Sequence, residues 1–437
     1  MKKNEEYIVT CIDENRMGSG IVKIENQVVF VPDLLKDEVC KIKIVKVKKN
    51  YAFGIILDLI QPSNYRIKPL CPYKTCGGCQ YMNVDYAYQI EMKSRQMKEL
   101  FHRNVKEEIQ VLHTIESINP LYYRNKAQFP VQVKDGQILM GFYRKHSNDI
   151  VSCNECKIQS KEINNIYQWL QSHISIQQAK ELRHIFIRAS KNESQVVFIG
   201  RDDSKFQKLS NQLMDTFPKV TSILFNFNNR KDNVILGEEY KILSGRDFII
   251  EECMGNKIQL HFKSFFQVNP IQMEILYQKA IELANLKKDE RCIDLYSGTG
   301  TIALAISKYV KHVTGVEIVK EAVDNANKNK ELNHITNCDF ICQDATEFAH
   351  EHKNDNIDVL FVDPPRKGMT KQGIEDIVTL KPNRIVYISC NPDSLCRDLN
   401  VFDQNGYECQ IIQPVDMFCY TTGIENIAII GFVKQTV

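Results

Sequence analysis

From about residue 270 onward, helical patterns alternate with short apolar stretches that have the character of buried strands. These stretches are RCIDLY, HVTGVEI, CDFICQD, IDVLFVD, RIVYISC, YECQIIQPV and IAIIGFV. The alternation predicts a parallel sheet with helices on both faces, a doubly wound α/β domain over residues 263–437. It is the strongest constraint on the chain, because ligands of such sheets bind where the strands end.

The first of these strands runs directly into a glycine turn, DLYSGTG, which a helical run follows. A Rossmann-like strand–turn–helix of this kind lets the backbone approach a nucleotide-like cofactor. Glu317 ends the next strand, where a carboxylate can accept both ribose hydroxyls. Both NAD and S-adenosylmethionine (SAM) satisfy these features. Asp294 in a DxxxGxG pattern, and Asp363 in the Asp-Pro-Pro that ends the fourth strand, favour a SAM-dependent methyltransferase.

The strand RIVYIS ends at Cys390, which is therefore expected to point into the same site. A thiolate suits one methylation above others, because C5 of uracil is not nucleophilic until a thiolate attacks C6. A base must then remove the C5 proton. Glu425, just before the last strand, is a carboxylate in a suitable place. Arg366 stands where amino-group methyltransferases tend to carry an aromatic residue. These residues favour methylation of uracil at C5.

The motifs DPPRKG and SCNP, followed by a glutamate before the last strand, resemble the RNA (uracil-5-)methyltransferases of the RumA/TrmA type. The resemblance spans nearly the whole chain and implies that Cys390 is the nucleophile and Glu425 the base that takes the C5 proton. One position departs from the pattern. The family usually has a histidine two residues before the base, where this chain has Gly423.

The resemblance also implies a set of binding residues. FFQVN resembles the family's FxQvN segment, with Gln267 at SAM and Phe265 near the target base. Tyr296, Gly298, Glu317 and Asp363 match the remaining SAM contacts, and Asp363 is also placed at the uracil edge.

Fifteen cysteines are many for a chain with no apolar signal segment at its N-terminus. The expected location is the cytoplasm, where cysteines indicate metal or catalysis before disulfides. Cys71, Cys76 and Cys79 form C-x4-C-x2-C, and Cys153 and Cys156 follow in SCNEC. This spacing allows an iron–sulfur cluster with one later cysteine, or zinc between two CxxC pairs. The family resemblance, with GFYR before Cys156, implies a [4Fe–4S] cluster on Cys71, Cys76, Cys79 and Cys156.

Residues 1–62 are rich in Val and Ile with period-two alternation, which predicts a small β-barrel. Its stretch 41–49 holds five lysines and no acid, and Tyr51 and Phe53 follow. Lysines beside aromatics suit single-stranded nucleic acid, although lysines also protect ordinary edge strands. The resemblance implies an OB-like TRAM domain here, and a strand-rich central iron–sulfur domain over residues 63–262. Barrel and cluster together resemble the ribosomal-RNA branch of the family.

The formal charge is only +2, so any nucleic-acid footprint must be local. No apolar run is long enough to cross a membrane, and no obligate protein partner is evident. A stacked uracil must be extruded or lie in a loop to meet a thiol. Candidate phosphate contacts in the central region are Arg124, Lys126, Arg144 and Lys145.

The sequence thus predicts a SAM-dependent enzyme that methylates C5 of uridine in 23S rRNA through a covalent Cys–C6 intermediate. One alternative is the same chemistry on tRNA. Another is a non-catalytic RNA-binding iron–sulfur protein. A radical SAM enzyme is a third class, but its usual CxxxCxxC spacing is absent.

Overall fold

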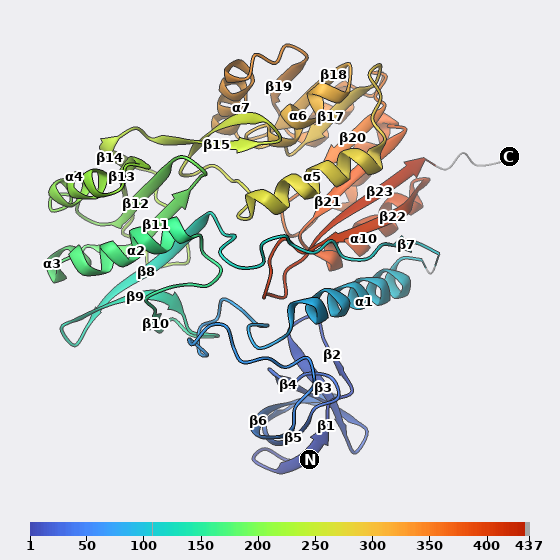
Figure 1. Cartoon of the computed structure of the whole chain (residues 1–437). Helices are drawn as coiled ribbons and strands as arrows, with labels where there is room; N and C mark the ends of the chain where they lie inside the picture. The colour runs from blue at the N-terminus through green and yellow to red at the C-terminus, as the bar shows by residue number, and fades with distance from the viewer. Residues whose placement is uncertain (107, 433–437) are drawn as a thin grey trace.

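The structure, a computed structural model, describes residues 1–106 and 108–432. Its strands form three large sheets and one separate hairpin, which follow one another from an N-terminal barrel to a C-terminal α/β unit (Figure 1). Over the residues described, no helix combines the length and apolar character needed to span a membrane.

The first sheet is a six-stranded half-barrel in the order β1-β5-β6-β4-β3-β2. Alternation in β5 shows which face of the sheet is inside: Cys40, Ile42 and Ile44 are fully buried, whereas Lys41 points outward. Its strands are β1 (Glu6–Thr10), β2 (Asp13–Glu14), β3 (Ser19–Ile24), β4 (Gln27–Pro32), β5 (Val39–Val47) and β6 (Tyr51–Gln61).

The second sheet has seven strands in the order β10-β9-β8-β11-β12-β13-β14, and α2 packs on it through Tyr167 stacked on Phe129. Its strands are β8 (Lys126–Lys134), β9 (Gln137–Tyr143), β10 (Ile150–Ser152), β11 (Leu182–Ala189), β12 (Ser194–Gly200), β13 (Val220–Phe227) and β14 (Tyr240–Gly245). The helices of this region are α2 (Lys161–His173), α3 (Ile176–Ala179) and α4 (Gln207–Thr216).

The third sheet has the order β19-β18-β17-β20-β21-β23-β22-β7. Its strands are β17 (Arg291–Leu295), β18 (His312–Glu317), β19 (Cys338–Cys342), β20 (Val359–Val362), β21 (Arg384–Ser389), β22 (Tyr407–Val415), β23 (Glu425–Phe432) and the short β7 (Gln110–Val111). The run from β19 to β21 is parallel, but β23 is inserted antiparallel between β21 and β22. The predicted parallel α/β domain is therefore found, with an antiparallel end that the strand pattern did not reveal.

Helices cover both faces of the third sheet (Figure 1). One hydrophobic core joins one face to α5 and α6, and a second joins the other face to α1, α8, α9 and α10. The helices are α5 (Pro270–Ala284), α6 (Thr301–Ile306), α7 (Lys320–Leu332), α8 (Ala345–Glu351), α9 (Lys371–Ile377) and α10 (Pro392–Gln404), with 3-10 turns η1 (Ser307–Tyr309) and η2 (Val378–Leu380).

Two elements from the expected central region also pack on the third sheet. Met97 and Phe101 of α1 (Tyr86–Asn104) share a core with Phe402 of α10. The hairpin of β15 (Phe248–Cys253) and β16 (Asn256–His261) packs into the core with α5. Buried contacts therefore cross the second predicted boundary, at residue 262. The division of the chain at 62 and 262 stays a prediction.

Candidate active site

The glycine turn between β17 and α6 uses left-handed backbone at three positions. Gly298 and Gly300 have φ angles of 53° and 82°, which glycine adopts without strain, and the non-glycine residue Tyr296 has a φ angle of 64°. A Cβ on Gly300 would lie 2.5 Å from Cζ of Phe340, so the turn packs tightly there. Apart from its two chain neighbours, no atom of the residues that the structure describes lies within 4 Å of a Cβ built on Gly298, so the turn is open at that point. Buried Asp294 accepts the backbone N–H of Ala303 at 3.0 Å and so ties the turn to α6.

Glu317 ends β18 beside this turn, as the sequence predicts. Its carboxylate accepts the backbone N–H of Gly298 at 3.1 Å and that of Val319 at 3.0 Å. Ile318 next to it is 64% exposed although it is apolar. Asp344 follows β19 at the same edge and caps α8 through the N–H of Thr346. Neither Ile318 nor Asp344 was among the predicted site residues, although an acid directly after the third strand was a usable signal.

Cys390 and Glu425 come together although 35 residues separate them in the chain. The antiparallel register of β21 and β23 pairs Ser389 with Asn426, so the next residues outward are Cys390 and Glu425. Cys390 is half-buried, and Glu425 is only 2% exposed. The two residues therefore occupy adjoining strand ends.

The surroundings of the thiol disfavour the thiolate. Burial, together with the carboxylates of Glu425 and Asp363 and against the opposing charge of Arg366, raises the pKa of Cys390 to about 11. Burial also raises the pKa of Asp363 to about 7. Burial, followed by the charge of Asp363, raises the pKa of Glu425 well above its usual range. The three predicted residues are thus all desolvated, and the charges of Asp363 and Glu425 act against ionisation of Cys390.

The segment that carries Phe265 and Gln267 is held from the second sheet. Fully buried Arg188 on β11 donates to the carbonyl oxygens of His261 and Ser264 at 3.1 and 2.8 Å. The amide of Asn125 donates to the backbone oxygen of Gln267 at 3.3 Å. Gln267 is 6% exposed, whereas the ring of Phe265 is 68% exposed. The segment thus presents one free aromatic ring on an anchored backbone.

Helix α1 holds the loop that leads to Glu425. The ammonium group of Lys93 donates to Oδ1 of Asp416 at 2.6 Å and to the carbonyl of Gly423 at 2.9 Å. Both ionic side chains are buried. A Cβ on Gly423 would lie 2.8 Å from Cδ2 of Phe418, so Phe418 fills the space that a larger residue at 423 would need.

We expect Lys93→Met to lower the free energy of unfolding by about 3–5 kcal/mol, because it leaves the Asp416 carboxylate buried without its partner. Urea denaturation measures this change. Lys98→Met, on the exposed face of the same helix, is the control and should change stability by no more than about 0.5 kcal/mol. Equal effects of the two variants would show that the buried pair does not secure the loop.

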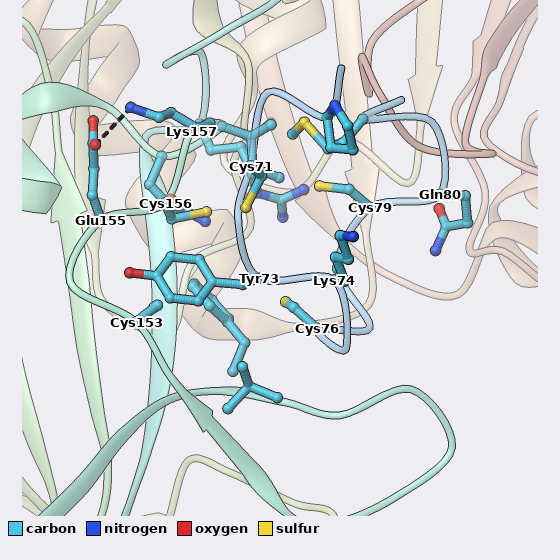
Figure 2. A pocket seen from close by; sticks show the side chains of 18 of the residues that line it. Cys71, Tyr73, Lys74, Cys76, Cys79, Gln80, Cys153, Glu155, Cys156 and Lys157 are labelled. Atoms are coloured by element: carbon cyan, nitrogen blue, oxygen red, sulfur yellow. Dashed lines mark hydrogen bonds and ion pairs between the residues drawn. The ribbon is translucent and has the colours of Figure 1, made fainter. Parts of the chain in front are cut away.

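The clustered cysteines line one cavity of about 730 Å³ (Figure 2). One loop carries Cys71, Cys76 and Cys79, whose side chains face Cys156 across the cavity. None of the cysteines that line the cavity forms a disulfide. Cys153 is instead buried against Tyr167, with Sγ 3.9 Å from its hydroxyl oxygen. All five cysteines line the cavity, but Cys153 is the most buried of them and has a contact with a tyrosine hydroxyl.

The chemistry of the donor set is compatible with an iron–sulfur cluster, because the four thiols are free and such clusters are held by cysteine thiolates. Among the residues that the structure describes, no three His, Cys, Asp or Glu side chains converge closely enough to hold one metal ion. The loop is also fixed to the GFYR segment, because Gly77 N–H donates to the Tyr143 carbonyl at 3.0 Å.

The candidate RNA contacts lie on two surfaces. Arg124 and Lys126 line the cysteine cavity, and burial with the charges of Arg188 and Arg124 lowers the pKa of Lys126 to about 8. Arg144 and Lys145 are exposed nearby. On the barrel, Tyr51 and Phe53 form an aromatic cluster with Phe30, which the sequence analysis did not single out; the ring centroids are 5.5–6.1 Å apart.

Comparisons with known proteins cover nearly the whole chain. Residues 85–430 match the family described as tRNA (Uracil-5-)-methyltransferase, and residues 2–57 match the TRAM domain. A curated RNA methyltransferase of Oceanobacillus iheyensis is 37% identical over 446 residues, which is 98% of this chain and 97% of the relative. One from Staphylococcus epidermidis is 39% identical over 453 residues, covering 100% and 99%.

A solved structure shows the same overall architecture. The tRNA (uracil-54, C5)-methyltransferase of Pyrococcus abyssi, in complex with S-adenosyl-L-homocysteine, superposes with a TM-score of 0.75 at 25% identity. The match covers 97% of this chain and 99% of that chain. The predicted α/β methyltransferase fold is thereby confirmed, and the small β-barrel predicted at the N-terminus is found as a curled half-barrel.

Proposed function

The chain belongs to the RNA (uracil-5-)methyltransferase family, and from this premise we propose that it methylates C5 of a uridine in 23S rRNA with Cys390 as nucleophile. That it is a SAM-dependent RNA methyltransferase with a TRAM domain follows from the family itself. We add to this family assignment the role of Cys390 and the choice of 23S rRNA as the substrate.

One observation carries the catalytic proposal: a thiol and a buried carboxylate stand at adjoining strand ends. Cys390 and Glu425 flank the register pair Ser389–Asn426, and the charge of Asp363 acts on both of them. A nucleophile and a base so placed can serve opposite steps of one covalent cycle on a single ring. This pairing has no use in direct methylation of a nitrogen lone pair.

The neighbouring strand ends fit SAM. The turn is open at Gly298, Ile318 offers an exposed apolar side chain, and Ser297 has a buried hydroxyl without a hydrogen-bond partner among the described residues. We assign Gln267, Tyr296, Gly298, Glu317 and Asp363 as the residues that would hold it. When bound, SAM supplies an electrophilic methyl group on a positively charged sulfonium.

The protein's own residues carry the remaining steps. The Cys390 thiolate adds to C6 of the uracil, and the electron pair of the C5–C6 double bond makes C5 nucleophilic. After C5 has gained its methyl group, the Glu425 carboxylate removes the C5 proton, and the C6–S bond breaks to restore the double bond and the thiolate. We propose that Phe265 stacks on the target base, which must leave its neighbours to reach the thiol.

The raised pKa values set the pH dependence of this scheme. Cys390 must lose its proton and Glu425 must be ionised, and both pKa values are shifted upward. At neutral pH only a small fraction of free enzyme holds the thiolate, and that fraction grows as pH rises. We expect kcat/KM to increase about tenfold per unit between roughly pH 6 and pH 9. A flat profile over this range, with the fold intact, would contradict the assignment.

The choice of 23S rRNA rests on the barrel together with the cysteine cavity. Transfer RNA is the second candidate, because the structurally similar Pyrococcus abyssi enzyme is named for a tRNA uridine. Nucleoside mass spectrometry separates them after incubation with SAM and either unmodified RNA. We expect 5-methyluridine in 23S rRNA only. Its appearance only in tRNA would overturn the choice of RNA and keep the chemistry, and its absence from both would overturn the function.

We further propose that Cys71, Cys76, Cys79 and Cys156 hold a [4Fe–4S] cluster. Cys156→Ala should then lose the cluster's visible absorbance and most of its iron after anaerobic purification. Cys153→Ala is the matched control, because this thiol lies three residues away and packs on Tyr167; it should keep its iron. Zinc in place of iron, or the reverse pattern of loss, would contradict this ligand set.

A further inference from the structure

The turn between β2 and β3 of the N-terminal barrel reaches the loop that carries Cys390. Arg16 in this turn donates to the Asp393 carboxylate with both terminal guanidinium nitrogens, Nη2 to Oδ1 at 2.6 Å and Nη1 to Oδ2 at 3.1 Å. Asp393 lies in the first turn of α10, three residues after Cys390. A bidentate pair of this kind fixes direction as well as distance.

The same turn also touches the loop that leads to Glu425. A Cβ on Gly18 would lie 3.3 Å from Cγ2 of Thr422 and 3.1 Å from Cβ of Gln80. Thr422 in turn donates its backbone N–H to Oε1 of Gln80 at 3.2 Å. Residues 15–18, here called the barrel turn, therefore sit against both loops from which the proposed nucleophile and base extend.

The barrel turn is held rigidly in this position. Inside it, Oδ1 of Asn15 accepts the N–H groups of Met17 and Ser19, each at 3.0 Å. Beside it, buried Glu14 on β2 accepts the Tyr88 hydroxyl at 2.8 Å and Arg95 at 3.0 Å, both from α1. Since α1 packs on the C-terminal sheet, the turn is anchored to the domain that holds the site.

The side chain of Met17 is the exposed apolar group of the barrel turn. It is 77% exposed, whereas the preceding Arg16 is paired with Asp393 and the following Gly18 is buried. Extrusion of a target nucleotide breaks its stacking with its neighbours and leaves a gap between them. Nucleic-acid-binding proteins insert apolar side chains between bases, methionine among them. A flexible thioether is suited to an irregular gap of this kind.

We propose that the barrel turn forms part of the rim of the target-uridine site and that Met17 contacts the nucleotide next to the target uridine. This inference rests on the proposed function, since it takes the site beside Cys390 as the place where a uridine is received. It makes Met17 a residue that recognises RNA, and Arg16 a positioning residue that acts through Asp393. The barrel then contributes to the reacting site as well as to distant RNA contacts.

The charges around the turn agree with an RNA neighbour. The Asp393 side chain is 65% exposed, and an isolated carboxylate there would repel a phosphate backbone. Arg16 neutralises it. An ion pair this exposed adds little to folding stability, so its effect should be seen in RNA binding and turnover rather than in unfolding.

Oxidation of Met17 tests the contact without any need for methylation. The enzyme is treated briefly with hydrogen peroxide, alone and with saturating 23S rRNA fragment in the absence of SAM, and sulfoxide at each methionine is measured by mass spectrometry. We expect RNA to slow oxidation of Met17 about tenfold or more. Met214, on α4 of the second sheet, is the reference and should not change. Equal oxidation of Met17 with and without bound RNA would overturn the inference.

Kinetics supply the second arm. Met17→Ala should raise KM for RNA about tenfold with kcat little changed. Ile8→Ala, which removes another exposed apolar side chain of the barrel, should leave both constants unaltered. An unchanged KM in Met17→Ala would contradict the recognition role while the wild-type enzyme still forms 5-methyluridine. Absence of that product in the wild type would instead count against the proposed function.

The role of Arg16 has its own test. Arg16→Asp and Asp393→Arg should each lower kcat/KM at least about fivefold, whereas the doubly substituted enzyme, with the charges exchanged, should recover most of the loss. Arg230→Asp is the control for a simple change of charge, because Arg230 forms an exposed ion pair with Asp232 in the connection between β13 and β14. Losses that add in the double variant would show that the pair does not position the turn.

Discussion

Cys390→Ala should bind RNA and SAM but form no 5-methyluridine, with kcat lowered by about 10⁴-fold or more. The alanine methyl group cannot add to C6, so C5 never becomes nucleophilic. The loss should be confined to chemistry, because Cys390 is half-buried at a strand end and contributes little to the core. Quantitative nucleoside mass spectrometry over long incubations measures the residual rate.

The control for this variant is Cys396→Ala. Cys396 is a buried thiol on the helix that follows Cys390 and plays no part in the proposed chemistry. It should keep most of the activity if the fold is intact. Appreciable turnover by Cys390→Ala would rule out the covalent route, and the C5 methyl transfer would then need a different account.

Glu425→Gln should stop the cycle one step later and accumulate protein covalently bound to methylated RNA. The amide cannot accept the C5 proton, so the C6–S bond does not break. Turnover should fall about 10²–10⁴-fold, as for removal of a general base. The adduct is visible as a shifted band in denaturing gels and as added mass on the protein.

Glu408→Gln, on neighbouring β22, should behave as the wild type and leave no adduct. A Glu425→Gln variant that turns over normally would show that another group removes the proton, with Asp363 the first alternative, because its charge acts on Glu425. A variant that is inactive without any adduct would place Glu425 before the methyl transfer.

Sequence reasoning predicted the elements of the site because each is marked locally. The glycine turn, the carboxylate after β18 and the thiol after β21 all follow short apolar strands, and the ends of parallel strands lie at one edge of a sheet. The approach of Glu425 to Cys390 was less accessible. It depends on β23 pairing antiparallel with β21, and strand order across a sheet has no local signature.

What the sequence did not reveal are contacts between distant segments. Lys93 lies 323 residues from Asp416, and Arg16 lies 377 residues from Asp393. A lysine on a helix or an arginine in a turn is ordinarily a solvated surface charge, so nothing in the local pattern marks these two. The packing of α1 on the third sheet was also missed, because it too joins segments that are distant in the chain.

The most direct test of covalent catalysis is to locate the adduct itself. Wild-type enzyme is incubated with SAM and RNA that carries 5-fluorouridine, whose C5 fluorine cannot be removed as a proton, and the trapped protein is digested and sequenced by mass spectrometry. We expect a methylated fluorouridine on the peptide that contains Cys390 and on no other. Trapping on a different cysteine, or an unmodified Cys390 peptide in enzyme that methylates normal RNA, would contradict it.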